Sequence, residues 1–152
     1  MMSAGSKGEN NMRCIALAAC LLACAAPAAF AAKWMPLRNS STASLSIDEA
    51  SISRRGDQVR LKYMVEFGRP QQDRLHQVAY RSVVTAAILR CNARTVSLGK
   101  SDIYTGPKAT GVLIATTEPS NRETAFNPVE KDTSDEDLWR HACEKKPEAK
   151  KP

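Results

Sequence analysis

The chain has 152 residues, with 22 lysines and arginines against 16 aspartates and glutamates, which gives a formal net charge of +6. This length suits one domain, and the aromatic residues, 5% of the sequence, are not interleaved with the basic ones, so the composition argues against a nucleic-acid-binding protein. A mildly basic protein can still associate weakly with an anionic membrane surface.

The first element, residues 12–31, is organised like a secretory signal peptide. Arg13 precedes an apolar run from Cys14 to Ala26, and the cleavage pattern Ala29-Phe30-Ala31 follows. The run is shorter than the roughly 20 residues of a membrane-spanning helix. We therefore predict that residues 1–31 are an N-terminal extension and signal peptide. Cleavage after Ala31 would export the protein to the periplasm, the cell surface or the medium.

An alternative lies inside the same segment. Leu21-Leu22-Ala23-Cys24 resembles a bacterial lipobox, which would leave a lipidated Cys24 at the mature N-terminus and make an outer-membrane lipoprotein. The apolar run before Cys24 is short if translation starts at Met12, as we expect. We therefore favour cleavage after Ala31 over lipidation of Cys24.

Residues 45–67 are predicted to form a β-hairpin. In its second half, apolar residues alternate with polar ones, the pattern of a strand with one buried and one solvated face. The apolar positions are Val59, Leu61, Tyr63, Val65 and Phe67. In the first half the alternation slips at residues 48–50, which suggests a β-bulge. Gly56-Asp57 supplies the turn, and Gly68 and Pro70 are expected to end the second strand.

The turn of this hairpin also contains Arg55-Gly56-Asp57, the tripeptide that integrins recognise. A hairpin tip would display it well. The simpler interpretation is that a Gly-Asp pair is what the backbone of a tight turn needs. We favour the turn interpretation.

The segment Tyr80–Cys91 is ambiguous. Its apolar residues fit a helical stripe, whereas its β-branched residues fit a strand buried on both faces, so propensity leaves both structures open. Residues 94–106 then predict a strand pair or one bent strand, and residues 111–117 predict another strand, because glycine and proline separate these segments.

A C-terminal helix is predicted from Ser134 onward. Ser134 and Asp137 form an S-x-x-D capping pattern, and Leu138, Ala142 and Cys143 share one apolar side. Residues 145–152 read as a basic, disordered tail. Strands followed by one helix predict an α+β fold with two layers, in which the helix covers an antiparallel sheet.

Five cysteines are present, and three of them lie in the predicted signal peptide. Cleavage leaves Cys91 and Cys143, and an even pair in an exported domain predicts one disulfide. A metal or redox site and two free thiols are the alternatives. The disulfide is favoured because the mature chain has neither a C-x-x-C motif nor a paired-histidine spacing.

Two classes of function are compatible with these residues. A small exported hydrolase could use Ser82 with His76 and Asp73, although no G-x-S-x-G motif surrounds Ser82. A haem-binding protein could use His76 or His141, but a C-x-x-C-H motif is missing. We favour a non-enzymatic interaction domain without metal or cofactor, which binds a protein in the envelope or on a host surface.

From Trp34 to Cys143 the chain resembles the surface-adhesin protein E-like family of Gram-negative bacteria. The resemblance is carried by Ser46–Tyr63, by Tyr80–Cys91, by the strands containing DIYTG and GVLIA, and by the helix DLWRHAC near Cys143. It implies a domain over residues 32–144 and an antiparallel sheet with one helix held by the cysteine pair.

The same resemblance implies that Tyr80–Cys91 is a strand. It also implies an adhesin-like role, because the family takes its name from a member that sticks to host matrix proteins. One departure is the stretch before the helix. The family has a proline, one residue and a serine there, whereas this chain has the longer NPVEKDTSDED, so the approach to the helix is expected to differ.

Overall fold

The computed structural model describes residues 32–75 and 77–144. The predicted signal peptide, the lipidation alternative at Cys24, the basic tail and His76 lie outside the described residues, so these expectations stay predictions.

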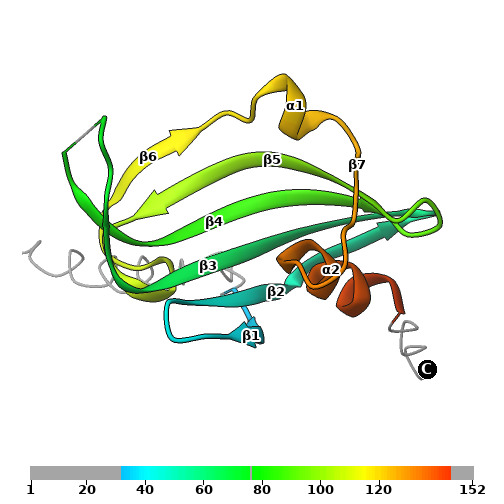
Figure 1. The fold of residues 1–152 in the computed structure, drawn as a ribbon, viewed down its shortest axis with the longest axis horizontal. Helices are drawn as coiled ribbons and strands as arrows, with labels where there is room; N and C mark the ends of the chain where they lie inside the picture. Colours follow the sequence, from blue (N-terminus) through cyan, green and yellow to red (C-terminus); the bar gives the residue numbers. More distant parts are fainter. Residues whose placement is uncertain (1–31, 76, 145–152) are drawn as a thin grey trace, which may run out of the picture. The chain divides into compact units, whose positions relative to one another are not determined.

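An antiparallel sheet of seven strands forms the body of the described chain (Figure 1). Six strands follow one another as a meander in the order β1-β2-β3-β4-β5-β6, and the short β7 pairs with β5. The strands are β1 (Trp34–Asn39), β2 (Ala43–Arg55), β3 (Gln58–Gln72), β4 (Ala79–Arg90), β5 (Thr95–Tyr104), β6 (Leu113–Thr117) and β7 (Asn127–Pro128).

Successive strands run in opposite directions, so the connections between them lie alternately at the two ends of the sheet. The turns at residues 56–57 and 91–94 lie at one end, which we call the disulfide end. The connections at residues 40–42, 73–78 and 105–112 lie at the other, which we call the loop end.

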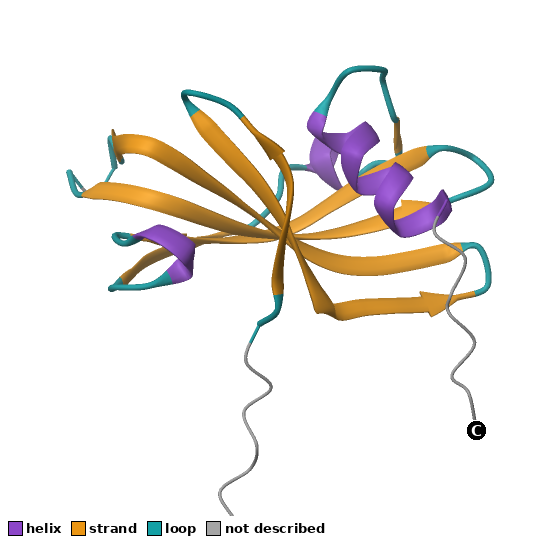
Figure 2. Cartoon of the chain, turned by 90° about the horizontal axis from the view of Figure 1, so that it is seen from below, coloured by secondary structure: helices purple, strands orange, loops and turns teal. Residues whose placement is uncertain are grey.

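The helical segments are short. They are η1 (Pro107–Ala109), α1 (Asn121–Thr124), α2 (Ser134–Trp139) and η2 (Arg140–Glu144), a π-helical turn that continues α2. Helix α2 covers one face of the sheet, the helix face, after the chain has crossed β5 through β7 (Figures 1 and 2). Within the described residues, no helix is long and apolar enough to cross a membrane.

The core lies between the helix face and α2, because alternation along each strand sends its apolar side chains to that face. Leu138 of α2 is fully buried there. The residues that make up the core are Leu45, Ile47, Val59, Leu61, Ala87, Leu89, Val96, Val129, Leu138 and Ala142. The predicted half-buried strand therefore exists, and its apolar side faces the helix.

The predicted bulge in the first strand is present. The register between β2 and β3 shifts between Asp48 and Ser53. Inside the shift, the Ser51 hydroxyl donates to the Asp48 carbonyl at 2.7 Å and accepts from the Lys62 N–H at 2.7 Å. A side chain thus replaces a ladder partner that the bulge removes.

The expectation that Gly68 and Pro70 end the second strand is wrong, because β3 continues to Gln72. The register between β3 and β4 shifts between Glu66 and Gln71, so Pro70 lies where the ladder is already interrupted and its missing N–H costs no strand hydrogen bond. Gly68 donates its N–H to the Thr42 carbonyl at 2.9 Å.

The ambiguous segment Tyr80–Cys91 is a strand, as the family resemblance implied: all of it except Cys91, which begins the following turn, lies in β4 (Ala79–Arg90). Residues 94–106 contain one bent strand, β5, rather than a pair. The bend coincides with a register shift between Thr85 and Ala87 of β4, opposite Gly99 of β5. The predicted antiparallel sheet with a C-terminal helix tied to it by a disulfide is confirmed.

The C-terminal helix begins at Ser134 as predicted, but the predicted capping residue is wrong by one position. Thr133 is the N-cap, and its hydroxyl accepts from the Glu136 N–H at 3.3 Å. Ser134 is instead the first helical residue. The hydroxyl one residue earlier is selected because contacts outside the helix hold the backbone of Thr133, as described below.

Replacing Leu138 with alanine should lower the free energy of unfolding by about 2–5 kcal/mol, because it removes a fully buried side chain between helix and sheet. Urea unfolding of the two proteins measures this. Leu75→Ala is the matched control, since Leu75 is 84% exposed, and it should change stability by less than about 0.5 kcal/mol. Equal effects of the two substitutions would contradict the assignment of Leu138 to the core.

Candidate functional site

At the disulfide end, Cys91 of the β4–β5 turn is bonded to Cys143 of η2, with the two Cα atoms 5.4 Å apart. Trp139 donates its indole N–H to the Cys91 carbonyl at 3.2 Å, and Arg54 of β2 donates to the Ala142 carbonyl. The helix is therefore joined to the β4–β5 turn by a covalent bond and a hydrogen bond, and to the end of β2 by a hydrogen bond. Cys143 acts as a cross-link in this arrangement.

The integrin-like tripeptide Arg55-Gly56-Asp57 also lies at the disulfide end, where it contacts the β4–β5 turn. Gly56 has a φ of +58°, whereas Asp57 is not among the residues with positive φ, which matches a two-residue turn with glycine first. The Asp57 carboxylate accepts from the Asn92 N–H at 2.7 Å, and its backbone carbonyl accepts from the Cys91 N–H at 3.0 Å. Asp57 thus connects the two turns of the disulfide end, which supports the turn interpretation.

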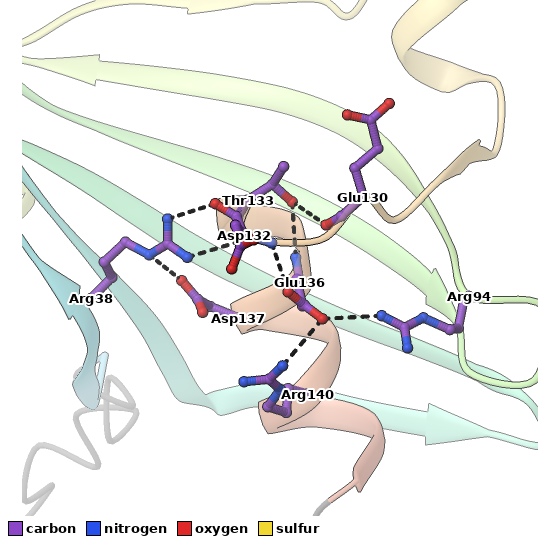
Figure 3. A network of polar contacts seen from close by, with 8 residues as sticks. All are labelled: Arg38, Arg94, Glu130, Asp132, Thr133, Glu136, Asp137 and Arg140. Carbon is purple, nitrogen blue, oxygen red and sulfur yellow. Dashed lines mark hydrogen bonds and ion pairs between the residues drawn. The ribbon is translucent and has the colours of Figure 1, made fainter.

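A network of charged groups fixes the start of α2 to the first strand (Figure 3). Arg38 of β1 donates to the carbonyls of Asp132 and Thr133 at 3.1 and 3.3 Å. Its Nε atom lies 2.5 Å from Asp137 Oδ2. The guanidinium therefore holds both the approach to the helix and its first turn, and this determines which hydroxyl caps the helix.

The same network continues through Glu136, which is 8% exposed (Figure 3). One carboxylate oxygen accepts from Arg94 at 3.2 Å and from Arg140 at 3.1 Å, and the other accepts from the Asp132 N–H at 2.8 Å. The backbone hydrogen bond from Asp132 and the charges of Arg140 and Arg94 lower the pKa of Glu136, although desolvation opposes them.

The residues proposed for a hydrolase have structural partners. Ser82 is fully buried; its hydroxyl donates to the Gly106 carbonyl at 2.7 Å and accepts from the Ala109 N–H at 3.0 Å. It thereby holds η1 against the face of the sheet opposite the helix. The Asp73 carboxylate accepts from the Leu75 N–H at 3.0 Å within the β3–β4 connection. These contacts give Ser82 and Asp73 roles in positioning the backbone.

His141 lies on η2 with its Nε2 atom 3.6 Å from Glu49 Oε1. It borders a shallow hollow of 480 Å³ that Leu37, Asp137, Arg140 and Glu144 also line. Within residues 32–75 and 77–144, no group of three or more histidines, cysteines, aspartates and glutamates is placed to hold a metal ion.

The loop end differs in character from the disulfide end. Its β3–β4 connection exposes Leu75 and Val78, which are 84% and 38% accessible. Val112 and Leu113, at the start of β6, are 65% and 48% accessible. Large apolar side chains that gather at one end of a sheet are a frequent feature of protein-binding surfaces.

The two edges of the sheet are also unequal. Strand β1 contains Pro36 and a register shift between Pro36 and Arg38, and α2 packs beside it. These features discourage a further strand from pairing there. Strand β6, Leu113–Thr117, has neither proline nor charge, and within the described residues it pairs only with β5. Its outer edge is the one suited to accept an additional strand.

The sequence profile of the family described as Surface-adhesin protein E matches residues 34–144. The chain belongs to the surface-adhesin protein E family. A comparison with curated protein sequences gives no match.

Solved structures of Haemophilus influenzae protein E have a similar fold. One has 17% sequence identity and a TM-score of 0.56, and the match covers 73% of this chain and 83% of that one. A second, from a non-typeable strain, has the same identity and TM-score and covers 78% and 80%. At this identity the likeness concerns the fold alone.

Sequence reasoning about this member of the surface-adhesin protein E family missed three features. Strand β1 was not predicted, although Met35 and Leu37 alternate with polar or helix-breaking residues. The apolar loop end was also missed, since nothing in the sequence brings residues 75–78 near residues 112–113. The charge network was missed because Arg38 lies 94 residues before its acceptor Asp132.

Glu136→Gln should lower the urea midpoint at pH 7, because the amide cannot form the two ion pairs. The folded-state pKa of Glu136 is depressed, so its stabilising effect is present above the unfolded-state value of about 4.3 and is lost as the pH falls through the folded-state value. The deficit relative to wild type should therefore shrink between pH 5 and pH 2.

The control for this experiment is Glu130→Gln, which alters an exposed glutamate in the same segment. Its urea midpoint should follow the wild type at both ends of the pH range. A deficit of Glu136→Gln that stays constant with pH would contradict an electrostatic role for Glu136.

Proposed function

We propose that this chain is an exported, non-enzymatic adhesin domain that binds a protein partner through the loop end of its sheet. The observation that carries the proposal is the exposure of Leu75, Val78, Val112 and Leu113 on connections at one end. Membership of a surface-adhesin family supports the class of function. The partner would be a protein of the bacterial envelope or of a host surface.

Two physical contributions would support binding there. The apolar side chains lose contact with water when a partner covers them, which contributes about 25 cal/mol per Å² of buried apolar area. The outer edge of β6 offers unpaired backbone groups, so an extended segment of the partner can add a strand beside Leu113–Thr117. Backbone pairing would give affinity, and the neighbouring apolar side chains would give specificity.

The location follows from the predicted processing. Cleavage after Ala31 would place the domain in the periplasm or at the cell surface, whereas a lipidated Cys24 would keep it on a membrane. The hydrolase alternative has less support, since the Ser82 hydroxyl is buried between two backbone partners. No described contact favours the haem alternative over the other roles of His141.

Binding to immobilised host matrix proteins and to envelope proteins tests the proposal. The variant carrying Val112→Ser and Leu113→Ser should bind its partner at least about tenfold more weakly, because truncating central apolar contacts costs about 1–3 kcal/mol. The control variant carries Arg122→Ser and Lys131→Ser, two exposed residues away from the loop end, and should bind like wild type. Unchanged binding by the first variant, with its melting temperature retained, would refute the proposed surface.

A further inference from the structure

The face of the sheet opposite α2 carries a trough that the protein-binding proposal does not use. A hollow of 290 Å³ spans β2 to β5, and its charged lining residues are Arg60 and Lys62. Its floor is low because it is built from small residues. These are Ser51, Ala86, Ser97 and Gly99.

A second hollow, of 250 Å³, lies beside the first at the disulfide end. Ser53, Arg54, Arg55 and Gln58 line it, and Arg60 borders both hollows. Because Arg60 borders both, the two hollows are neighbours along the hairpin of β2 and β3, and we call them together the basic trough.

Three charged residues of the described chain line the basic trough with side chains on this face, and all three are cations: Arg55, Arg60 and Lys62. Arg54 borders the second hollow, but its guanidinium lies on the helix face, where it donates to the Ala142 carbonyl. The nearest acid in the strand register is Asp48, opposite Lys62. Asp48 is 8% exposed, and its carboxylate accepts from the N–H groups of Lys33 and Ala50 at 2.9 and 3.1 Å. This one buried acid offsets part of the positive charge, and the exposed cations of the trough outnumber it.

The positions of these cations follow from the strand geometry. Arg60 and Lys62 are two residues apart on β3, so their side chains leave the same face about 7 Å apart. Arg55 is in register with Gln58, on the same face as Arg60. The cations thus follow one line, with an apolar floor between them that includes Ala86 and Ile88.

Two elements border the trough on its own face of the sheet, since α2 lies on the other face. Near the loop end, Ser82 holds η1. On the β5 side, Ser97 donates its hydroxyl to the Thr124 carbonyl at the end of α1 at 2.8 Å. On the same side, the guanidinium of Arg90 lies 3.7 Å from the centre of the Phe126 ring and closes the border.

We propose that the basic trough binds a linear acidic polysaccharide. Guanidinium groups pair with sulfate and carboxylate groups through two parallel hydrogen bonds, and a line of cations matches charges repeated along a chain. The apolar floor receives the hydrocarbon face of the sugar rings. Such binding is charge-dependent and weakens as the salt concentration rises.

The trough suits this ligand better than the other polyanions. No aromatic residue within 32–75 and 77–144 lines it, so this part of the chain offers no stacking surface for a single-stranded nucleic acid. It lies on a face of the sheet and not at an edge, so an acidic peptide would find no unpaired strand to extend. A flat membrane surface would not fill a recess.

Titration of the full exported chain with a defined heparin oligosaccharide tests the proposal, with neutral dextran of equal length as the ligand control. Wild type should bind heparin and not dextran, and its Kd should rise at least tenfold between 50 and 500 mM NaCl. Arg60→Gln with Lys62→Gln should weaken binding at 50 mM NaCl at least tenfold.

The matched control is Arg69→Gln with Arg74→Gln, which removes two exposed charges towards the loop end. It should change the Kd less than about twofold. Equal loss in both variants would mean attraction by net charge alone and would overturn the proposal. Binding to vesicles of anionic lipid that exceeds binding to heparin and depends on Arg60 and Lys62 would overturn it in favour of a membrane.

Chemical modification of arginines in the wild-type protein tests the same site without variants, so the result does not depend on whether a variant folds. Heparin should protect Arg60 from modification by phenylglyoxal and should leave Arg69 reactive. Equal protection of the two arginines, or none at Arg60, would contradict a site in the trough.

Discussion

The bond between Cys91 and Cys143 is the constraint on which the rest of the structure depends. Helix α2 has six residues and its π-helical continuation has five, and isolated helices of this length are not stable in water. The bond closes a loop between residues 52 positions apart. In the chain-entropy model this lowers the entropy of the unfolded chain and so raises the free energy of unfolding by about 4 kcal/mol. That amount is a large part of the net stability of a typical domain.

The disulfide end, where the cross-link lies, has a structural role that the other surfaces of the domain do not share. At the disulfide end, Asp57, Trp139 and Arg54 add hydrogen bonds around the bond, and Leu138 seals the helix face. Because the helix covers one face in this way, the two proposed binding surfaces lie elsewhere, at the loop end and on the opposite face. The two surfaces differ in chemistry, since the loop end is apolar and the basic trough is cationic.

Local patterns in the sequence were sufficient for much of this architecture. Alternation predicted the hairpin and its buried side, Gly56-Asp57 predicted the turn, and the cysteine pair indicated the joint between helix and sheet. Propensity alone could not decide Tyr80–Cys91, because a strand buried on both faces has the same composition as a buried helix. Family resemblance supplied that answer.

The remaining features depend on contacts between distant residues, which local patterns do not contain. Two adjacent hydroxyls, those of Thr133 and Ser134, were equally good caps by sequence, and Arg38 of β1 decides between them by holding the backbone of Thr133. Pro70 is tolerated in β3 because the register shifts around it. The candidate surfaces arise from residues on neighbouring strands and connections, so no local pattern in the sequence indicated them.

Hydrogen exchange of the wild type and of the variant carrying Cys91→Ser and Cys143→Ser tests the central claim most directly. The account predicts that amides of α2 and of the β4–β5 turn exchange much faster in the variant. Amides of the β2–β3 hairpin should change less, and the free energy of unfolding should fall by about 2–5 kcal/mol. Unchanged exchange in α2, or a uniform increase across the sheet, would contradict the claim that this bond holds the helix in place.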